Sequence, residues 1–164
     1  MSDPCVTVVV GSFVADGITP DSNGIVWTVQ RIDGWFDSTA ARVATADHLP
    51  FGEVVTLVRE NARAIALTLV AHALPLVDLT TLPLGAALCF TAMDSIEVPF
   101  ACVYAPATLE VVDPVLDLFA AVRRVGPIQK RILGESVAVR FLIPLLAEDP
   151  YRWDGGPGVG SSYD

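Results

Sequence analysis

The sequence "SVAVRFLIPLLAEDPYRW", residues 136–153, indicates the fold class. Large apolar side chains stand at every second position from Val137 to Leu145, and this period is typical of a β-strand that buries one face. Pro144 cannot donate a ladder hydrogen bond, so it marks the strand as an edge strand or as bulged at that point. The strand is expected to span 136–147, with its buried face formed by Val137, Val139, Phe141, Ile143 and Leu145.

The residues after this strand change in character. Asp149 and Pro150 favour a turn, and two aromatic residues follow them closely. The chain then continues as "DGGPGVGSSYD", in which few side chains are large enough to offset the entropy lost on ordering. We therefore expect a single domain, residues 1–153, and a flexible glycine-rich tail, residues 154–164.

The rest of the chain also consists mainly of expected strands. Segments rich in β-branched and aromatic residues, bounded by turn-forming residues, are typical of strands. "RAIALTLVA", residues 63–71, is apolar or small on both faces, so we expect it to lie inside a sandwich or beneath a neighbouring subunit. The other expected strands are 6–10, 25–32, 54–58, 100–104, 108–112 and 128–133.

One helix is predicted, at residues 114–124. Asp113 can cap its first turn, Pro114 suits the first helical position, and Gly126 with Pro127 would end it. The predicted fold class is therefore mainly β (α+β), a β-sandwich or split barrel with one helix.

Two segments fit neither pattern. Residues 33–51 have no periodicity and read as a long loop or an extended arm, which in compact domains is usually functional or disordered. Residues 76–93 stay ambiguous, because Asp78 could cap a helix whereas Pro83 and Gly85 favour a short or broken one.

Composition bears on the partners of the protein. The chain carries 19 acidic and 10 basic residues, a formal net charge of -9, and Lys130 is its only lysine. Tight binding to nucleic acid requires clustered Lys and Arg, so no specific nucleic-acid binding is expected. Hydrophobic residues make up 52% of the chain and the mean hydropathy is +0.54, so part of the apolar surface is expected to face a partner.

No membrane span or signal peptide is predicted. Residues 64–93 are strongly apolar, but Pro75, Asp78 and Pro83 interrupt them, and no run reaches the roughly 18 residues of a spanning helix. The first residues, "MSDPCVTVVVG", have an acid before the apolar run and no basic region, so synthesis in the cytoplasm is expected.

No catalytic, cofactor or metal site is predicted. The three cysteines match no metal spacing and read as buried thiols, and the two histidines lack a partner at ligand spacing. "GGPGVG" lacks the lysine and the helix of a phosphate-binding loop, and two adjacent carboxylates point to opposite sides of a strand. Assembly or binding is expected instead of catalysis. The residues considered are Cys5, Cys89, Cys102, His48, His72, Glu148 and Asp149.

Three sequence blocks occur in a telling order and spacing. The first is "VWTVQRIDGW" (26–35), followed by an irregular segment with Arg42 that leads to "LPFGEVV". The second is "ENARAIALTLVAHA" (60–73), and the third is "ESVAVRFLIPLLAEDPYRW" (135–153). Together they resemble the distal tail protein family of long, flexible-tailed bacteriophages.

The resemblance implies a non-enzymatic virion protein without cofactors. Six copies would form a ring beneath the tail tube and serve as a hub for tail-tip or baseplate proteins. The implied partners are further copies of this chain, the tail tube protein and the tail-tip proteins, and DNA would pass through an acidic ring without sticking. Many relatives carry a galectin-like domain after the Asp-Pro motif, so Asp149-Pro150 is expected to be a former domain boundary. The residues expected at subunit or partner contacts are Trp35, Phe36, Arg42, Leu49, Phe51, Tyr151 and Trp153.

Two alternatives stay open. The first is another tail or neck ring, such as a tail terminator. The second is a cell-wall-binding or hydrolytic tail-tip module, which would need exposed aromatics with a carboxylate pair or a metal site. Trp35, Tyr151 and Trp153 could bind sugar, but Trp and Tyr are also common at subunit interfaces.

Overall fold

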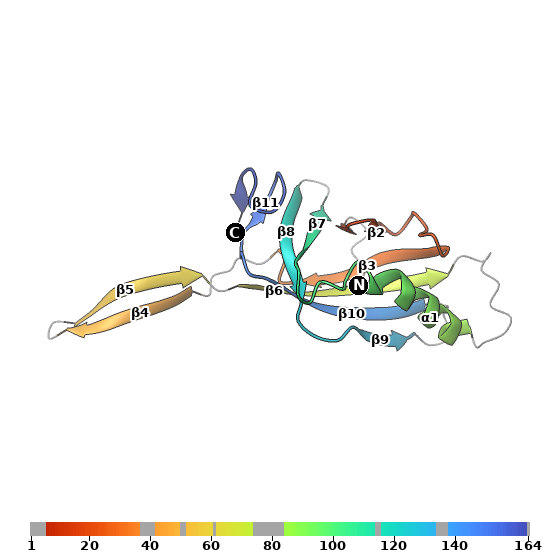
Figure 1. Ribbon diagram of the computed structural model, residues 1–164, viewed down its shortest axis with the longest axis horizontal. Coiled ribbons are helices and arrows are strands. Elements are labelled where there is room, and N and C mark those ends of the chain that lie inside the picture. The colour runs from red at the N-terminus through yellow and green to blue at the C-terminus, as the bar shows by residue number, and fades with distance from the viewer. Residues whose placement is uncertain are drawn as a thin grey trace.

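The computed structural model describes residues 6–36, 42–49, 52–60, 62–73, 84–113, 116–133 and 138–163 (Figure 1). Strands dominate, so the predicted mainly β fold is confirmed. The strands are β1 (Thr7–Val10), β2 (Phe13–Ala15), β3 (Ile25–Asp33), β4 (Arg42–Leu49), β5 (Gly52–Glu60), β6 (Arg63–Ala73), β7 (Ala107–Val112), β8 (Asp117–Arg124), β9 (Gln129–Ile132), β10 (Ala138–Ala147), β11 (Arg152–Trp153) and β12 (Ser162–Tyr163), and the helix is α1 (Leu84–Glu97).

Ten strands form one antiparallel sheet that curls over its own core. The main path runs β2-β1-β7-β8-β10-β6-β3, with β9 paired to β10 and with β11 paired to β8 and β12. β8 pairs with β7 along its whole length but meets β10 only at its last residues, Arg123 and Arg124. In Figure 1, β7 and β8 accordingly run steeply across the direction of β6 and β10. The two parts of the sheet therefore face each other across a shared core.

Residues 138–147 form β10, at the centre of this sheet. β10 pairs with β6 from Ala138 opposite His72 to Ala147 opposite Arg63. Its other side is shared, because β9 pairs with the first part and β8 with the last. Pro144 lies between these two partners, where its missing amide proton interrupts no continuous ladder. The predicted inward face is confirmed for Val139, Phe141, Ile143 and Leu145, which are all buried.

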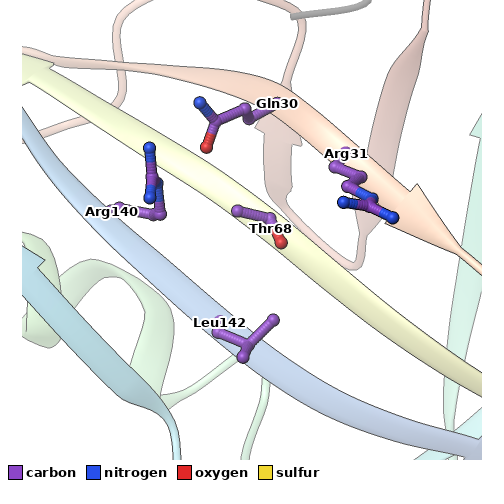
Figure 2. Close-up of a pocket in the computed structure, with 5 residues that line it drawn as sticks. All are labelled: Gln30, Arg31, Thr68, Arg140 and Leu142. Carbon is purple, nitrogen blue, oxygen red and sulfur yellow. The ribbon is translucent and has the colours of Figure 1, made fainter. Parts of the chain in front are cut away.

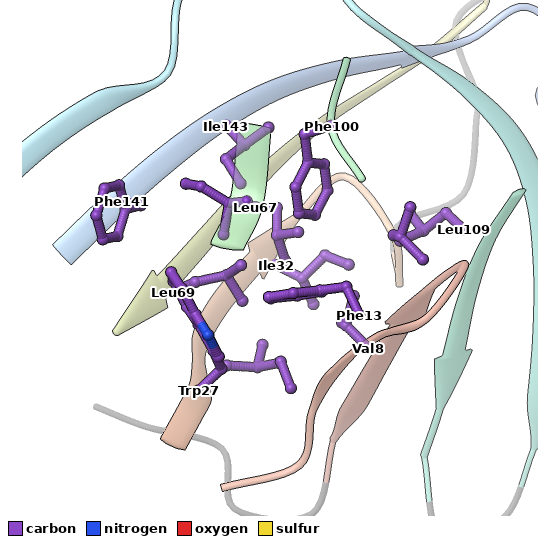
Figure 3. Close-up of a cluster of buried hydrophobic side chains, with 14 of the residues drawn as sticks. Val8, Phe13, Trp27, Ile32, Leu67, Leu69, Phe100, Leu109, Phe141 and Ile143 are labelled. Carbon is purple, nitrogen blue, oxygen red and sulfur yellow. The ribbon is translucent and has the colours of Figure 1, made fainter. Parts of the chain in front are cut away.

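The core is centred on four aromatic rings drawn from separate parts of the chain (Figure 3). The ring of Phe13 lies 5.2 Å from that of Trp27 and 5.5 Å from that of Phe100, both edge to face. Phe141 lies 5.5 Å from Trp27. Such pairs contribute roughly 0.5–1.5 kcal/mol each beyond the burial of their area. The Trp27 indole N–H also donates to Asp21 Oδ2 at 3.0 Å, so its polar atom is satisfied.

The helix predicted at residues 114–124 is wrong, because Asp117–Arg124 is strand β8. Leu118, Ala120 and Val122 are buried at every second position, which is the period of a strand. The Asp113 amide donates to the Leu116 carbonyl at 2.9 Å, within the short connection between β7 and β8. Asp113 therefore lies in the connection between two paired strands and does not begin a helix.

The ambiguous region contains the helix. α1 spans Leu84–Glu97 and buries Leu88, Ala92 and Ile96, spaced by four residues, while packing against β6, β9 and β10. The strand expected at 100–104 is wrong, since residues 98–104 hold turns and no strand. Among the residues that the structure describes, no helix is both long and apolar enough to cross a membrane.

The expected arm is present, but it is longer than the sequence indicated. β3 continues to Asp33, and β4 with β5 then forms an antiparallel hairpin that ends at Glu60 instead of Phe51. Within the described residues these two strands pair with each other and with no other strand. Figure 1 shows the hairpin projecting from the body of the protein.

The C-terminal segment folds back as a small hairpin. β12 pairs with β11, and the Asp154 amide donates to the Ser161 carbonyl at 3.1 Å. Ser161 N–H in turn donates to Asp154 Oδ1 at 2.8 Å. Residues 154–163, expected as a flexible tail, thus form the hydrogen bonds of a β-hairpin. Most of these residues are exposed. The division into a ring-forming domain and a tail stays a prediction.

Candidate assembly site at the base of the arm

The arm leaves the sheet through Gly34. Its φ of +83° lies in the left-handed region, and a Cβ atom at this position would collide with the carbonyl oxygen of Ala64 in β6. Only glycine therefore lets the end of β3 turn this closely against β6. This collision explains why glycine follows Asp33 in the first sequence block.

Two buried arginines hold the backbone beside this glycine. Arg63, 3% exposed, donates from Nη1 to the Gly34 carbonyl at 2.9 Å and from Nε to the Pro150 carbonyl at 2.7 Å. Arg152, 8% exposed, donates from Nη1 to the Trp35 carbonyl at 2.5 Å. Gly34, Trp35, Arg63, Pro150 and Arg152 are called the base cluster below.

Burying the two guanidinium groups of the base cluster costs free energy, which their hydrogen bonds offset. A buried charge is tolerated only when it is hydrogen-bonded, and both guanidinium groups have backbone carbonyls as acceptors. The Cζ atom of Arg152 also lies 6.0 Å from the centre of the Trp35 ring, at the outer limit of a cation–π contact. These contacts fix three segments that are distant in sequence.

Those three segments are the three blocks that carry the family resemblance. Gly34-Trp35 ends the first block, Arg63 lies near the start of the second, and Pro150 with Arg152 lies in the third. The structure thus gives the blocks a common physical purpose, which is to anchor the arm to the body. Arg63 and Arg152 are not among the residues expected at contacts from the sequence. The signal in the sequence is one arginine at the start of the apolar strand in the second block and one between Tyr151 and Trp153 in the third.

The residues predicted at partner contacts have different positions. Trp35 is 1% exposed and belongs to the core of its own chain, so it offers little surface to a neighbour. Phe36, next to the arm, is 49% exposed. Arg42 and Leu49 are the first and last residues of β4, and Phe51 lies outside the described residues. The role of this set in assembly stays a prediction.

Tyr151 and Trp153 pack back toward the body in the region of the base cluster. Both are half-buried. The Asp149 carboxylate accepts the Tyr151 amide at 3.0 Å and the Trp153 indole N–H at 2.9 Å. Asp149 therefore caps the turn that was expected from the Asp-Pro pair.

Metal and thiol chemistry adds no further site to the described part of the chain. There, no three His, Cys, Asp or Glu residues are grouped in a way that could hold a metal ion. Cys89 and Cys102 are buried free thiols, as expected, and Cys5 lies outside the described residues.

Two carboxyl groups have shifted pKa values, and both lie outside the base cluster. Burial raises the pKa of Glu110, and hydrogen bonding with Asp117 and repulsion from it raise that pKa further. Burial also tends to raise the pKa of Asp16, but hydrogen bonds from Thr19 and Ile18 outweigh it, so that pKa lies below its ordinary value.

Comparison with known proteins defines the fold class. No protein-family model and no curated protein sequence matches the chain. The fold is similar to that of a solved structure. That structure is described as the "Crystal Structure of SPP1 Dit (gp 19.1) Protein, a Paradigm of Hub Adsorption Apparatus in Gram-positive Infecting Phages".

The match to SPP1 Dit extends over 91% of this chain with a TM-score of 0.59 and 11% sequence identity. It covers 52% of the SPP1 protein, so the chain spans about half the length of that protein. The resemblance found in the three sequence blocks is thereby confirmed at the level of the fold.

Proposed function

We propose that this protein is a structural component of a phage tail. In this proposal it forms a homohexameric ring at the distal end of the tail tube and serves as a hub for tail-tip or baseplate proteins. The observation that supports this most is the fold match to SPP1 Dit over 91% of the chain. The six-fold number rests on the family resemblance of the sequence.

The projecting hairpin supports assembly. An isolated two-stranded hairpin is marginally stable in water, and its exposed edges can pair with other chains. β4 and β5 pair only with each other among the described strands, so an arm of this length needs a partner to hold it. A ring uses two different surfaces of each subunit, one of which the arm would supply.

The same proposal accounts for charge and location. The protein would reside in the virion at the tail tip after synthesis in the host cytoplasm, with the tail tube protein and tail-tip proteins as its other partners. A net charge of -9 suits a ring through which DNA passes without sticking. No enzymatic step is part of this role.

The mass of the assembled protein tests the ring. Native mass spectrometry over a concentration series should find a species of about 104 kDa, because each of six chains has a mass of 17.4 kDa. A monomer at every concentration would contradict the proposal.

A variant without the arm tests whether the arm joins neighbouring subunits. Replacing residues 37–61 by a short Gly-Ser linker should leave a folded monomer, because the body of the sheet does not pair with the arm. Truncation after Trp153 is the matched control, since it removes the exposed strand β12 elsewhere in the protein and should leave the ring intact. If the protein without the arm still forms rings of wild-type stability, the arm does not hold neighbouring subunits together.

A further inference from the structure

Positive charge gathers on the outer face of the sheet, although the protein as a whole is acidic. Four of its 10 basic residues line two cavities there, of about 370 and 360 Å³, and no aspartate or glutamate among the described residues lines either one. Figure 2 shows the first cavity, over β3, β6 and β10. We call the residues lining the two cavities the basic face; they are Gln30, Arg31, Thr68, Gln129, Lys130, Arg131, Arg140 and Leu142.

Strand pairing places the basic face on the side of the sheet opposite to the core. Arg31 of β3 lies opposite Thr68 of β6, and Thr68 lies opposite Leu142 of β10. Leu142 in turn lies opposite Gln129 of β9. Because Leu142 follows the core residue Phe141 along β10, this row of side chains points away from the core. Four strands therefore contribute to one polar surface.

Arg140 is the centre of the basic face, because it lines both cavities. Its side chain reaches from β10 over β6, toward Gln30 of β3 (Figure 2). Its Nε atom is buried and has no hydrogen-bond partner among the described residues, and Arg131 lies directly opposite it in the β10–β9 ladder. Two like charges at opposed positions destabilise a sheet, and a buried donor without an acceptor costs free energy. A bound anion would remove both costs.

Arg31 contributes less positive charge than its position suggests. Its Nε already donates to Asp33 Oδ1 at 2.7 Å, and the pair is exposed. The demand for negative charge therefore comes mainly from Arg140, Arg131 and Lys130.

The donors of the basic face suit a phosphate group better than a carboxylate. Besides the cations, the first cavity has the Thr68 hydroxyl and the Gln30 amide, and the second has the Gln129 amide. A carboxylate has one charge, whereas a phosphate monoester has a charge of roughly −1.5 to −2 at neutral pH and more acceptor oxygens, which guanidinium groups match in pairs. Several cations from different strands therefore fit the monoester.

The size of the cavities indicates that the phosphate belongs to a small molecule. Sites for small molecules measure roughly 300–1,000 Å³, and each cavity alone falls within this range. Leu142 lines both cavities and offers an apolar contact to the carbon part of such a ligand.

We propose that the basic face is a binding site for a small phosphate monoester. Arg140 and Arg131 bind the phosphate oxygens, Lys130 adds positive charge, and the hydroxyl of Thr68 and the amide of Gln30 donate further hydrogen bonds. The site does not depend on the proposed ring, because one chain supplies all of its residues.

Isothermal titration calorimetry with glycerol 3-phosphate as the probe tests the site. At constant ionic strength the wild type should bind one molecule per chain with a saturable signal. Arg140→Gln should weaken binding by about tenfold or more, because a charge-assisted hydrogen bond is lost. Arg131→Gln, on the exposed strand β9, should have an effect in the same direction. Circular dichroism checks that each variant is folded.

Arg123→Gln is the matched control. Arg123 is also an arginine of this sheet, but it lies in β8, outside the basic face, with its Nε 3.5 Å from Glu148 Oε1. This variant should bind the probe as the wild type does. No saturable binding by the wild type, or equal binding by the wild type and the folded Arg140→Gln and Arg131→Gln proteins, would overturn the site.

Three further probes identify the group that is recognised. Inorganic phosphate should displace glycerol 3-phosphate, whereas succinate and a single-stranded oligothymidylate should bind about tenfold more weakly or not at all, since each of their anionic groups has only one charge. Succinate that binds as tightly as glycerol 3-phosphate would show a carboxylate site. Tighter binding of the oligothymidylate would assign the basic face to a phosphodiester polymer. Either result, or a failure of phosphate to displace the probe, would overturn the proposal.

Discussion

Gly34 is the residue at which the chain passes from the sheet into the arm. Its left-handed backbone brings the chain against Ala64, and the carbonyl groups of Gly34 and Trp35 then accept hydrogen bonds from Arg63 and Arg152. The direction in which the arm leaves therefore depends on one residue without a side chain and two buried cations.

Substitution of Gly34 measures this constraint. Gly11 is a matched control, because it also has a positive φ, of 59°, but a Cβ there meets nothing within 4 Å. Gly11→Ala should cost about 1–2 kcal/mol from the backbone conformation alone. Gly34→Ala should cost about 2 kcal/mol more, because the Ala64 backbone must move. Urea unfolding gives both values, and equal losses would show that the close approach is not needed.

Asp16 should make stability depend on pH in the acid range. Its carboxylate accepts the amides of Ile18 at 2.9 Å and Thr19 at 2.7 Å, and these bonds hold its pKa below the ordinary value of 3.8. The carboxylate therefore stabilises the fold fully above about pH 3.8, and this contribution is lost as the pH falls through the folded pKa.

Asp16→Asn tests that dependence, since the amide keeps one acceptor oxygen but has no charge. The variant should be less stable than the wild type near neutral pH, and the difference should shrink as the pH falls below 3.8. Urea unfolding at several pH values measures it. Thr19→Val, which removes only the hydroxyl donor to Asp16 Oδ2, should show a smaller effect. A difference independent of pH would refute the role of the charge.

At the scale of elements, the sequence predicts strands well where one face is buried. β10 follows its apolar alternation because it has core on one side, whereas β6, apolar or small on both faces, directs Ile65, Leu67 and Leu69 into the core and leaves Ala64 exposed. The error at 114–124 arose because Leu118 and Val122 fit both a helical and a strand period, and Asp-Pro supplied a false helix start. The region of α1 is ambiguous in the sequence because Pro83 and Gly85 suggest a break, whereas in the described part of the helix Leu88, Ala92 and Ile96 form a buried stripe.

The C-terminal elements offer a test of where the domain ends. Truncation after Trp153 removes mostly exposed residues and the two-residue strand β12, so it should cost less than about 1 kcal/mol. Truncation after Ala147 removes Arg152 and the Pro150 carbonyl, which leaves groups of the base cluster without their partners. It should cost several kcal/mol or prevent folding. Thermal unfolding compares the two, and a large loss from the shorter truncation would place the domain end beyond Trp153.

For the molecule as a whole, the sequence predicts only part of the assembly site. The sequence indicated an arm near Trp35 and an apolar excess that calls for a partner. It did not indicate that Trp35 would be buried, because an aromatic residue beside an aperiodic segment has the same pattern in a core or at an interface. Nor did it show that Lys130, Arg131 and Arg140 converge, since β9 and β10 bring them together only through pairing.

In the proposed assembly, copies of this chain join through two different surfaces into a closed ring. Electron-microscopy class averages of the purified wild-type protein test it most directly, because they show the symmetry of the assembly. Six-fold rings with an open centre and with contacts between neighbours only are expected. Two-fold dimers built from one self-complementary surface, or monomers at every concentration, would contradict it.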